Sequence, residues 1–399
     1  MQKVLYISLS FVDVRETTSL YSDLIQEFLT NGHDVLVLAP HFYDGRKSEL
    51  VVEGGIKILR VPVSGLFSNN KYIKGLSNVL LPFLYKRALK KLKISLDFDL
   101  VMMPTPPITL LNLALWVKNK SKAKFYLILR DIFPQNAIDL KIMKPNGLIH
   151  TYFRNKEIAL YDLADKIGCM SPANIAYIEK HNPKVDKTKL HLLPNWENSP
   201  QWDENLDENE FRAKYGLNNK IVAIYGGNIG LPQRMENIIE LAQHCSELED
   251  LVFFLVGFGT EHEKIAALIK SLNLKNVILI ESVPKPEYVK FIQISDIGLI
   301  SLNQDFTIPN FPSKANSYYG YKKPILASVD VNTDFGIILE EIGAGFWSEA
   351  GDVASLKNNL LKLYKDPELR KKMGENGYQY MKNNLLTEHA YRTILKEIN

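Results

Sequence analysis

Two cationic residues of the chain stand in loops of the kind that bind anionic ligands. Arg234 follows a glycine-rich turn over residues 226–230, and Lys314 begins a helical segment at the end of a long polar loop. Glycines let the backbone approach a ligand closely, and a guanidinium group offers a fork of donors to phosphate oxygens. A lysine in the first turn of a helix opposes the helix dipole unless an anion lies beside it. Both positions therefore predict a phosphate site, with a tight turn and solvated surface cations as the alternative interpretation.

Further candidates lie in the neighbouring loops of the second half of the chain. Gly257 and Gly259 follow the strand-like segment 251–256, where they would again allow a ligand to approach the backbone closely. The loop that leads to Lys314 is polar, and a few polar contacts from such a loop can decide which ligand a pocket accepts. Its candidate residues are Asn303, Asp305 and Asn310.

An arginine–aspartate pair provides the candidate chemistry of the first half. Arg130 and Asp131 end the strand-like segment 124–129, where they would bind a substrate hydroxyl or take its proton. A structural ion pair that fixes the loop is the alternative interpretation. A stiff, proline-rich turn that contains Thr105 follows another strand-like segment of the same half.

Short apolar segments alternate with helical patterns along almost the whole chain, and this alternation predicts an α/β protein with parallel sheets. Two such units in series predict two Rossmann-like domains, whose ligands bind at the carboxyl ends of the strands. We expect domains at residues 1–196 and 203–383, and a C-terminal helix over 384–399 that packs back toward the first domain. The predicted strands lie at 3–8, 34–38, 57–61, 99–103, 124–129, 166–170, 189–193, 220–225, 251–256, 277–280, 297–301, 324–327 and 345–347.

Composition narrows the class of protein. A chain of 399 residues with 46% hydrophobic residues is long enough for two hydrophobic cores. Its two cysteines, Cys169 and Cys245, exclude a disulfide framework or a cysteine zinc site and indicate a reducing cytoplasm. The eight histidines show no metal-ligand spacing, and no apolar run is long enough to span a bilayer. We therefore expect a cytoplasmic protein that uses no metal.

The formal net charge of +3 hides an asymmetry between the two halves. Residues 1–200 carry 27 lysines and arginines against 18 acidic residues, and residues 201–399 carry 21 against 27. Within the basic half, segment 71–94 combines an apolar run with cations, a pattern typical of a helix in the interface of an anionic membrane. An ordinary helix with a solvated lysine face is the alternative. Nucleic acid is not an expected partner, because no nucleic-acid motif is present. The cations of the segment's second half are Lys86, Arg87, Lys90, Lys91 and Lys93.

Several motifs occur in an order that resembles family-4 glycosyltransferases of the GT-B fold. Within that family the chain is similar to the bacterial branch that builds capsules and O-antigens, which includes amino-sugar transferases of the N-acetylfucosamine type. The resemblance covers nearly the whole length and implies two Rossmann-like domains whose parallel sheets face each other across a cleft. Its motifs span residues 99–107, 130–134, 170–172, 193–196, 225–230, 256–259, 311–314 and 323–328.

This resemblance implies that the second domain binds a nucleotide-diphosphate sugar, with a UDP-sugar favoured. The base would lie near Gly257 and Val283, and the diphosphate would lie between the 227–234 loop and the helix that begins at Lys314. Family members transfer the sugar with retention and need no metal or other cofactor. Arg234 and Lys314 would stabilise the charge on the departing diphosphate, and Asp131 would orient acceptor or donor sugar. The implied donor-binding residues are Gly227, Asn228, Gly230, Gly257, Gly259, Val283, Asn303, Asp305, Asn310, Ser313 and Ser317.

The resemblance also implies an acceptor, which the first domain would hold. It would be a saccharide linked to undecaprenyl diphosphate, reached from the cytoplasmic face of the bacterial cell membrane through residues 71–94. The protein would then be peripheral on that inner face. The implied acceptor-side residues are Arg15, Thr105 and Arg130.

Two of the chain's departures from the family bear most on catalysis. The family has two glutamates eight positions apart, of which the second holds the ribose hydroxyls, whereas Pro309 and Ser317 occupy these positions here. The glycine-rich loop after the first strand is replaced by residues 10–16, which contain no glycine. Two alternatives therefore stay open. One is a degenerate GT-B protein that binds nucleotide sugar or glycan without catalysis, and the other is a sugar-nucleotide epimerase on the same fold.

Overall fold

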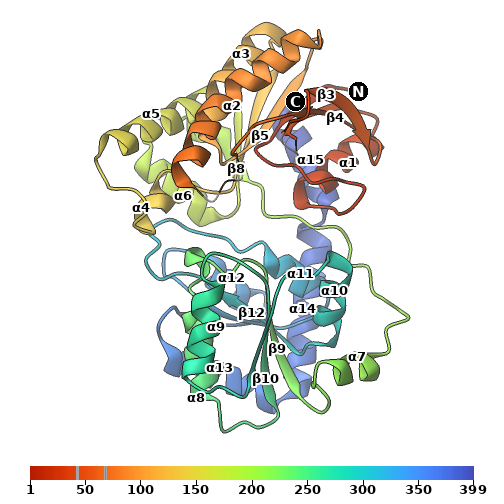
Figure 1. Cartoon of the computed structure of the whole chain (residues 1–399), viewed down its shortest axis with the longest axis vertical. Coiled ribbons are helices and arrows are strands. Elements are labelled where there is room, and N and C mark those ends of the chain that lie inside the picture. The colour runs from red at the N-terminus through yellow and green to blue at the C-terminus, as the bar shows by residue number, and fades with distance from the viewer. Residues whose placement is uncertain (42–44, 67, 69) are drawn as a thin grey trace. The chain divides into compact units, whose positions relative to one another are not determined.

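The chain forms two compact units in a computed structural model that describes residues 1–41, 45–66, 68 and 70–399. The first unit comprises residues 1–194 together with 387–399, and the second comprises residues 195–386. The division at 194 lies two residues before the predicted boundary. The return of the chain to the first unit begins at Thr387, three residues after the start of the predicted C-terminal helix. In each unit helices cover the faces of a sheet (Figure 1).

The first unit contains an eight-stranded sheet with the order β3-β4-β2-β1-β5-β6-β7-β8. Among the described residues β3 alone is antiparallel to its neighbour, and it was not expected from the sequence. Its side chains alternate and both Leu50 and Val52 are exposed, so this edge strand lacks the continuous apolar pattern of its neighbours. The strands are β1 (Lys3–Ile7), β2 (Asp34–Pro40), β3 (Glu49–Glu53), β4 (Ile56–Val61), β5 (Leu100–Pro104), β6 (Lys124–Leu129), β7 (Lys166–Cys169) and β8 (Leu190–Leu192).

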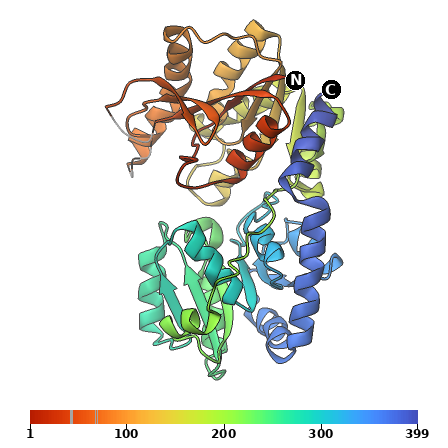
Figure 2. The same cartoon turned by 90° about the vertical axis from the view of Figure 1, so that its right-hand side faces the viewer.

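Helices α2, α3 and α5 of this unit lie side by side (Figure 1). Helix α15 packs against α1, where the rings of Phe28 and Tyr391 meet edge to face at 4.9 Å. The two ends of the chain therefore lie close together, and Gln2 hydrogen-bonds Asn399 (Figure 2). The helices are α1 (Leu20–Thr30), α2 (Lys71–Lys91), α3 (Leu111–Ser121), α4 (Gln135–Asp139), α5 (Leu148–Leu163), α6 (Pro172–His181) and α15 (Thr387–Ile398), with 3₁₀ turns η1 (Ile108–Leu110) and η2 (Lys187–Lys189).

The second unit contains a six-stranded parallel sheet with the order β11-β10-β9-β12-β13-β14. Successive residues of its central strands point to opposite faces, so Ile224 belongs to one hydrophobic cluster and Tyr225 to the other. The sheet is thus buried on both sides, as its continuous apolar strands predicted. The strands are β9 (Ile221–Gly226), β10 (Leu251–Val256), β11 (Val277–Ile280), β12 (Ile297–Ser301), β13 (Ile325–Val329) and β14 (Gly345–Glu349).

The short helix α11, which begins at Lys314, is held against the long helix α14 by close backbone packing. A Cβ atom at Gly374 of α14 would lie 2.0 Å from the Lys322 carbonyl oxygen, and one at Gly377 would lie 2.6 Å from the Tyr319 ring. The end of α11 is therefore placed by a close contact with α14. The helices of this unit are α7 (Glu208–Lys214), α8 (Glu236–His244), α9 (His262–Ser271), α10 (Lys285–Ile294), α11 (Lys314–Gly320), α12 (Phe335–Glu341), α13 (Val353–Lys365) and α14 (Pro367–Asn384), with one 3₁₀ turn, η3 (Leu231–Gln233).

Candidate functional site

The loops that follow β9 and β10 pack backbone against backbone. A Cβ atom at Gly257 would lie 1.9 Å from the Gly227 carbonyl oxygen, and one at Gly259 would lie 2.3 Å from the Ile229 carbonyl oxygen. The Ile229 amide also donates to the carbonyl of Phe258 at 3.1 Å. The glycines at 257 and 259 are therefore required by loop packing itself. A role for them in contacting a nucleotide base stays a prediction.

Lys314 lies over the end of β9. Its Nζ is 3.7 Å from the centroid of the Tyr225 ring, and a Cβ atom at Gly227 would lie 3.3 Å from the same nitrogen. Gly227 itself is exposed and has a φ of 131°, which favours glycine. The Tyr225 hydroxyl donates to the Asn228 carbonyl at 2.6 Å, which fixes the ring under the ammonium group.

No oxygen of the described residues accepts a hydrogen bond from Lys314 Nζ, although the side chain is half-buried. Loss of solvent around it lowers the pKa of the Lys314 ammonium group to about 7. A desolvated cation that has only an aromatic ring as a partner is stabilised by an anion that enters beside it. The arrangement therefore supports the phosphate-binding interpretation of Lys314.

Arg234 provides a second cation at the end of the same loop. Its backbone adopts a left-handed conformation with a φ of 39°, and its carbonyl accepts from the Ser301 hydroxyl at 3.1 Å. The buried amide of Asn237 donates to the same hydroxyl at 3.1 Å, so β12 and the start of α8 hold this loop together. Within the described part of the chain the guanidinium group forms neither an ion pair nor a hydrogen bond, and nearby Glu236 pairs with Lys264. Arg234 thus keeps its donors for a ligand.

The polar loop before α11 has a mixed role. The Asn303 amide donates to the Leu231 carbonyl at 3.0 Å, and its carbonyl oxygen accepts from the Asp305 backbone, so Asn303 joins this loop to the one that carries Arg234. The buried amide nitrogen of Asn310, in contrast, finds no acceptor within the described residues. Among the loop candidates Asn310 is therefore the one with an unused donor close to Lys314 in sequence.

The remaining donor-side candidates lie around the same edge of the sheet. The Asn228 amide donates to the Gln233 side chain at 2.8 Å, which braces the loop beside the buried Gly230. Ser313 is exposed at the start of α11, and the half-buried Val283 packs against the hydrophobic core. Their contacts with a donor stay predictions.

A carboxylate that the sequence did not indicate contacts the last candidate, Ser317. The Ser317 hydroxyl lies 3.1 and 2.9 Å from the two carboxylate oxygens of Glu197. The segment that carries this glutamate is tied to α11, because the Asn195 amide donates to the Phe311 carbonyl and the Asn316 amide donates to the Asn195 carbonyl. Residues 197 and 317 are 120 positions apart, so no local pattern links them.

The candidates of the first unit gather at the carboxyl ends of β5 and β6. The Thr105 hydroxyl donates to the Asp131 carbonyl at 3.1 Å and accepts from the Arg130 amide at 3.0 Å. The Arg130 guanidinium is buried and donates to the Leu193 carbonyl at 3.0 Å, whereas the Asp131 side chain is exposed. Arg130 and Thr105 therefore support the edge that presents Asp131. Direct contact of Arg130 or Thr105 with an acceptor stays a prediction.

Arg15 is held in the loop that replaces the glycine-rich turn after β1. Its Nε donates to Asp13 at 2.8 Å, and this contact lowers the pKa of Asp13 to about 2. The loop is fixed from below by buried Arg60, which pairs with Glu53 at 2.5 Å and donates to the carbonyls of Phe11 and Val12. The exposed Arg15 side chain thus projects from a rigid loop. Its contact with the acceptor substrate stays a prediction.

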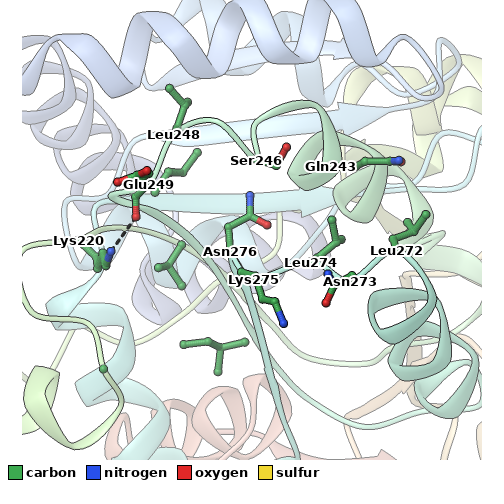
Figure 3. Close-up of a pocket in the computed structure, with 14 residues that line it drawn as sticks. Lys220, Gln243, Ser246, Leu248, Glu249, Leu272, Asn273, Leu274, Lys275 and Asn276 are labelled. Atoms are coloured by element: carbon green, nitrogen blue, oxygen red, sulfur yellow. Dashed lines mark hydrogen bonds between the residues drawn. The ribbon is translucent and has the colours of Figure 1, made fainter.

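A separate hollow of about 640 Å³ lies at the opposite edge of the second sheet, around the amino ends of β9, β10 and β11 (Figure 3). Lys220 donates across it to the Glu249 carbonyl at 2.7 Å, and the Asn276 amide donates to the Ala242 carbonyl at 2.8 Å. None of the predicted site residues lines it. The described residues also contain no group of three or more His, Cys, Asp or Glu side chains that could hold a metal ion.

Comparisons with known proteins bear on this site. Residues 207–380 match the family model "Glycosyl transferases group 1". The probable glycosyltransferase WbjE of Pseudomonas aeruginosa is 23% identical over 72% of this chain and 71% of its own length. The putative colanic acid biosynthesis glycosyl transferase WcaI of Escherichia coli is 23% identical over 58% of this chain, and the match spans little more than half of WcaI, 56% of its length.

Solved structures show the same fold at low sequence identity. The sucrose-phosphate synthase of Thermosynechococcus elongatus is 14% identical, with a TM-score of 0.75 over 99% of this chain and 98% of the other. Anabaena Alr3699/HepE, solved in complex with UDP and glucose, is also 14% identical, with a TM-score of 0.70 over 99% of both chains. The predicted fold class, α/β with two Rossmann-like domains of the GT-B type, is confirmed.

Proposed function

We propose that this protein is a glycosyltransferase that moves a sugar from a nucleotide-diphosphate donor to a lipid-linked saccharide. The match of residues 207–380 to group 1 glycosyl transferases and the GT-B fold support this proposal. The observation that carries the donor half of the proposal is Lys314. Its ammonium group is desolvated, rests on the Tyr225 ring and has no anionic partner among the described residues. A diphosphate supplies the missing charge.

The same two cations account for the chemistry. When the bond between the anomeric carbon and the diphosphate breaks, negative charge builds on the departing oxygens, and Lys314 and Arg234 stabilise it. The acceptor hydroxyl attacks from the face that the diphosphate leaves, and its proton passes to the leaving phosphate, so the configuration at the anomeric carbon is retained. Asp131 orients the acceptor or the donor sugar. No metal ion takes part in this proposal, because protein cations carry the electrostatic work.

Known proteins support the choice of donor and pathway. Alr3699/HepE has been solved with UDP and glucose, which favours a UDP-sugar as the donor of this chain. The name of WcaI refers to colanic acid, a polysaccharide, and supports a role in bacterial surface polysaccharide biosynthesis. Within that class we propose capsule or O-antigen synthesis, with a saccharide on undecaprenyl diphosphate as acceptor.

A surface of the first unit supports the lipid-linked acceptor. Five exposed apolar side chains recur at helical spacing along α2, and the cations of the helix continue the same stripe toward its end. Helix α5, which packs against α3, also exposes Leu148, Ile149 and Tyr152, and its Lys156 hydrogen-bonds Asn112 of α3. Apolar side chains beside lysines fit the interface of an anionic bilayer. The α2 stripe comprises Ile73, Leu76, Val79, Leu80 and Phe83.

This surface would bind at the membrane face and would not cross it. Across the described residues, no helix combines the length and apolar character that a membrane span requires. We therefore propose peripheral attachment to the inner face of the cell membrane through residues 71–94.

A thermal-shift screen tests the donor proposal. The purified protein is heated with nucleoside diphosphates of each base and with their sugar conjugates, with and without magnesium, because a ligand of the folded state raises the melting temperature. We expect a shift with UDP and UDP-sugars that does not depend on magnesium. No shift with any nucleotide would overturn the proposal and favour the non-catalytic alternative that the missing glutamates suggested.

A further inference from the structure

The Glu197 carboxylate contacts α11, the helix that begins at Lys314. It contacts the hydroxyl of Ser317, which lies three residues after Lys314 on α11. Residues three apart on a helix share a face, so Ser317, which contacts the carboxylate, lies on the same side of α11 as Lys314. The half-buried Glu197 is therefore placed along the helix whose first residue is the cation that the donor diphosphate would contact.

A second observation places Glu197 near the end of β9. The phenol oxygen of the half-buried Tyr288 lies 2.0 Å from the position that a Cβ atom would take at Gly226, one residue before Gly227. Burial raises the pKa of Tyr288 well above its ordinary value, and the charge of Glu197 contributes to that shift. The carboxylate is thus near the end of β9 as well as the start of α11, the two elements that meet at Lys314.

The position of Glu197 is fixed by its backbone. Its amide donates to the Leu385 carbonyl at 2.9 Å, and the residue forms a parallel bridge with Leu386 at the end of the chain segment after α14. Ser317 then orients the side chain by donating toward both oxygens. A carboxylate held in this way is a preformed hydrogen-bond acceptor, whereas a serine alone at this place would offer only a hydroxyl.

We propose that Glu197 accepts hydrogen bonds from vicinal hydroxyls of the nucleotide sugar, and that Ser317 is the positioning residue of this carboxylate. The inference rests on the proposed function, because it assumes that Lys314 takes the diphosphate. A carboxylate repels phosphate oxygens, so its partner is a neutral part of the donor that carries hydroxyl donors. Both the ribose and the transferred sugar have such hydroxyls, and the experiment separates them.

Isothermal titration of the full chain with UDP, 2′-deoxy-UDP and UDP-glucose tests the proposal on the parent protein, Glu197→Gln and Ser317→Ala. Glutamine keeps the size of the side chain and removes its charge. A hydrogen bond to a charged group corresponds to about a tenfold to hundredfold change in affinity. If Glu197 holds the ribose, the parent protein prefers UDP to 2′-deoxy-UDP by about that factor, and Glu197→Gln binds both alike. Ser317→Ala is expected to weaken the same preference partly.

If Glu197 holds the transferred sugar instead, UDP and 2′-deoxy-UDP bind the parent protein alike, and Glu197→Gln loses the extra affinity of UDP-glucose over UDP. Glu368→Gln, an exposed glutamate at the start of α14, is the matched control and should bind all three probes as the parent does. Unchanged binding of all three probes by a folded Glu197→Gln variant would overturn the inference. Failure of the parent protein to bind UDP would instead overturn the proposed function.

Discussion

The ammonium nitrogen of Lys314 lies 3.7 Å from the centroid of the Tyr225 ring, whereas Nζ of Lys323, nine residues later, donates to two carbonyl oxygens at 2.7 Å. Desolvation lowers the pKa of both side chains, to about 7 for Lys314 and about 8 for Lys323. Desolvation therefore disfavours the charged form of both lysines. Lys323 donates to two carbonyl oxygens, whereas Lys314 finds no such acceptor among the described residues. This contrast supplies a matched pair for experiment.

Replacing Lys314 by methionine should abolish most turnover without weakening the fold. The leaving diphosphate loses one cation, which is expected to reduce kcat/KM about a hundredfold or more. The melting temperature should stay the same or rise, because an unpaired desolvated charge is removed. Lys323→Met is the control: it leaves two carbonyls without their donor and should lower the melting temperature. Normal turnover in Lys314→Met would remove this lysine from the mechanism.

Nucleotide affinity should depend on pH through Lys314. Its pKa is about 7 in the free protein, so the side chain is charged at pH 6 and mostly neutral at pH 8.5, values chosen roughly one unit or more to either side. A bound diphosphate favours the charged form, so binding above pH 7 requires proton uptake and weakens by up to about tenfold per pH unit. Titration calorimetry in buffers of different ionisation enthalpy measures this proton. Lys314→Met should bind UDP weakly and without proton uptake, and a parent protein that takes up no proton at high pH would contradict the prediction.

Arg234 should show opposite effects on stability and activity when it is replaced by glycine. A non-glycine residue in the left-handed region costs on the order of 1 kcal/mol, and the φ of Arg234 is 39°. Arg234→Gly should therefore raise or preserve the melting temperature while it lowers UDP affinity and turnover. Arg234→Lys keeps a charge but loses the fork of donors, so its activity should lie between those of the parent and the glycine variant. Equal activity in all three proteins would show that the guanidinium does not contact the donor.

Membrane attachment should depend on the cations of α2 and the segment after it. Changing all five to glutamine is expected to weaken binding to vesicles that contain anionic lipid by ~1 kcal/mol per charge. Lys86 and Lys90 also lie over the Trp116 ring, so the melting temperature of the variant is measured in parallel. The five residues are Lys86, Arg87, Lys90, Lys91 and Lys93.

A variant with five exposed lysines of the second unit changed to glutamine has the same net charge and should bind vesicles like the parent. If both variants bind vesicles equally well, the membrane-binding prediction is wrong and α2 is an ordinary helix with a solvated face. The control lysines are Lys214, Lys270, Lys371, Lys372 and Lys382.

Packing between the β9 and β10 loops should make Gly257 intolerant of any side chain. A Cβ atom there meets the Gly227 carbonyl at 1.9 Å, and the backbone must shift, at a cost of about 1–3 kcal/mol. Gly257→Ala should lower both the melting temperature and UDP affinity, because the loop beside Lys314 moves. Gly75→Ala is the control, since it lies on exposed α2 with nothing within 4 Å and should be neutral or stabilising. Parent-like behaviour of Gly257→Ala would show that the loops pack less closely.

Much of the fold and part of the site follow from local sequence. The strands of the second sheet are continuous apolar runs between loops, and β10 has the predicted bounds. Lys314 is predictable because its charge conflicts with its helical position, and that conflict is local. Tyr225 is not predictable, since a tyrosine in an apolar strand resembles any core residue. Glu197 was missed because its partner is distant in sequence and its segment has the composition of a linker.

The first unit needs helix α15 to cover its core, although this helix comes after the whole second unit in the sequence. The ring of Tyr391 and the side chains of Ile394 and Ile398 fill the face next to α1, and Glu397 pairs with Lys166. The last thirteen residues thus complete a body whose other 194 residues leave the ribosome first. During synthesis this apolar face stays uncovered until the whole second unit has been made. A chain cut short at residue 386 should therefore aggregate through its earliest part, and a separately supplied 387–399 peptide should restore solubility.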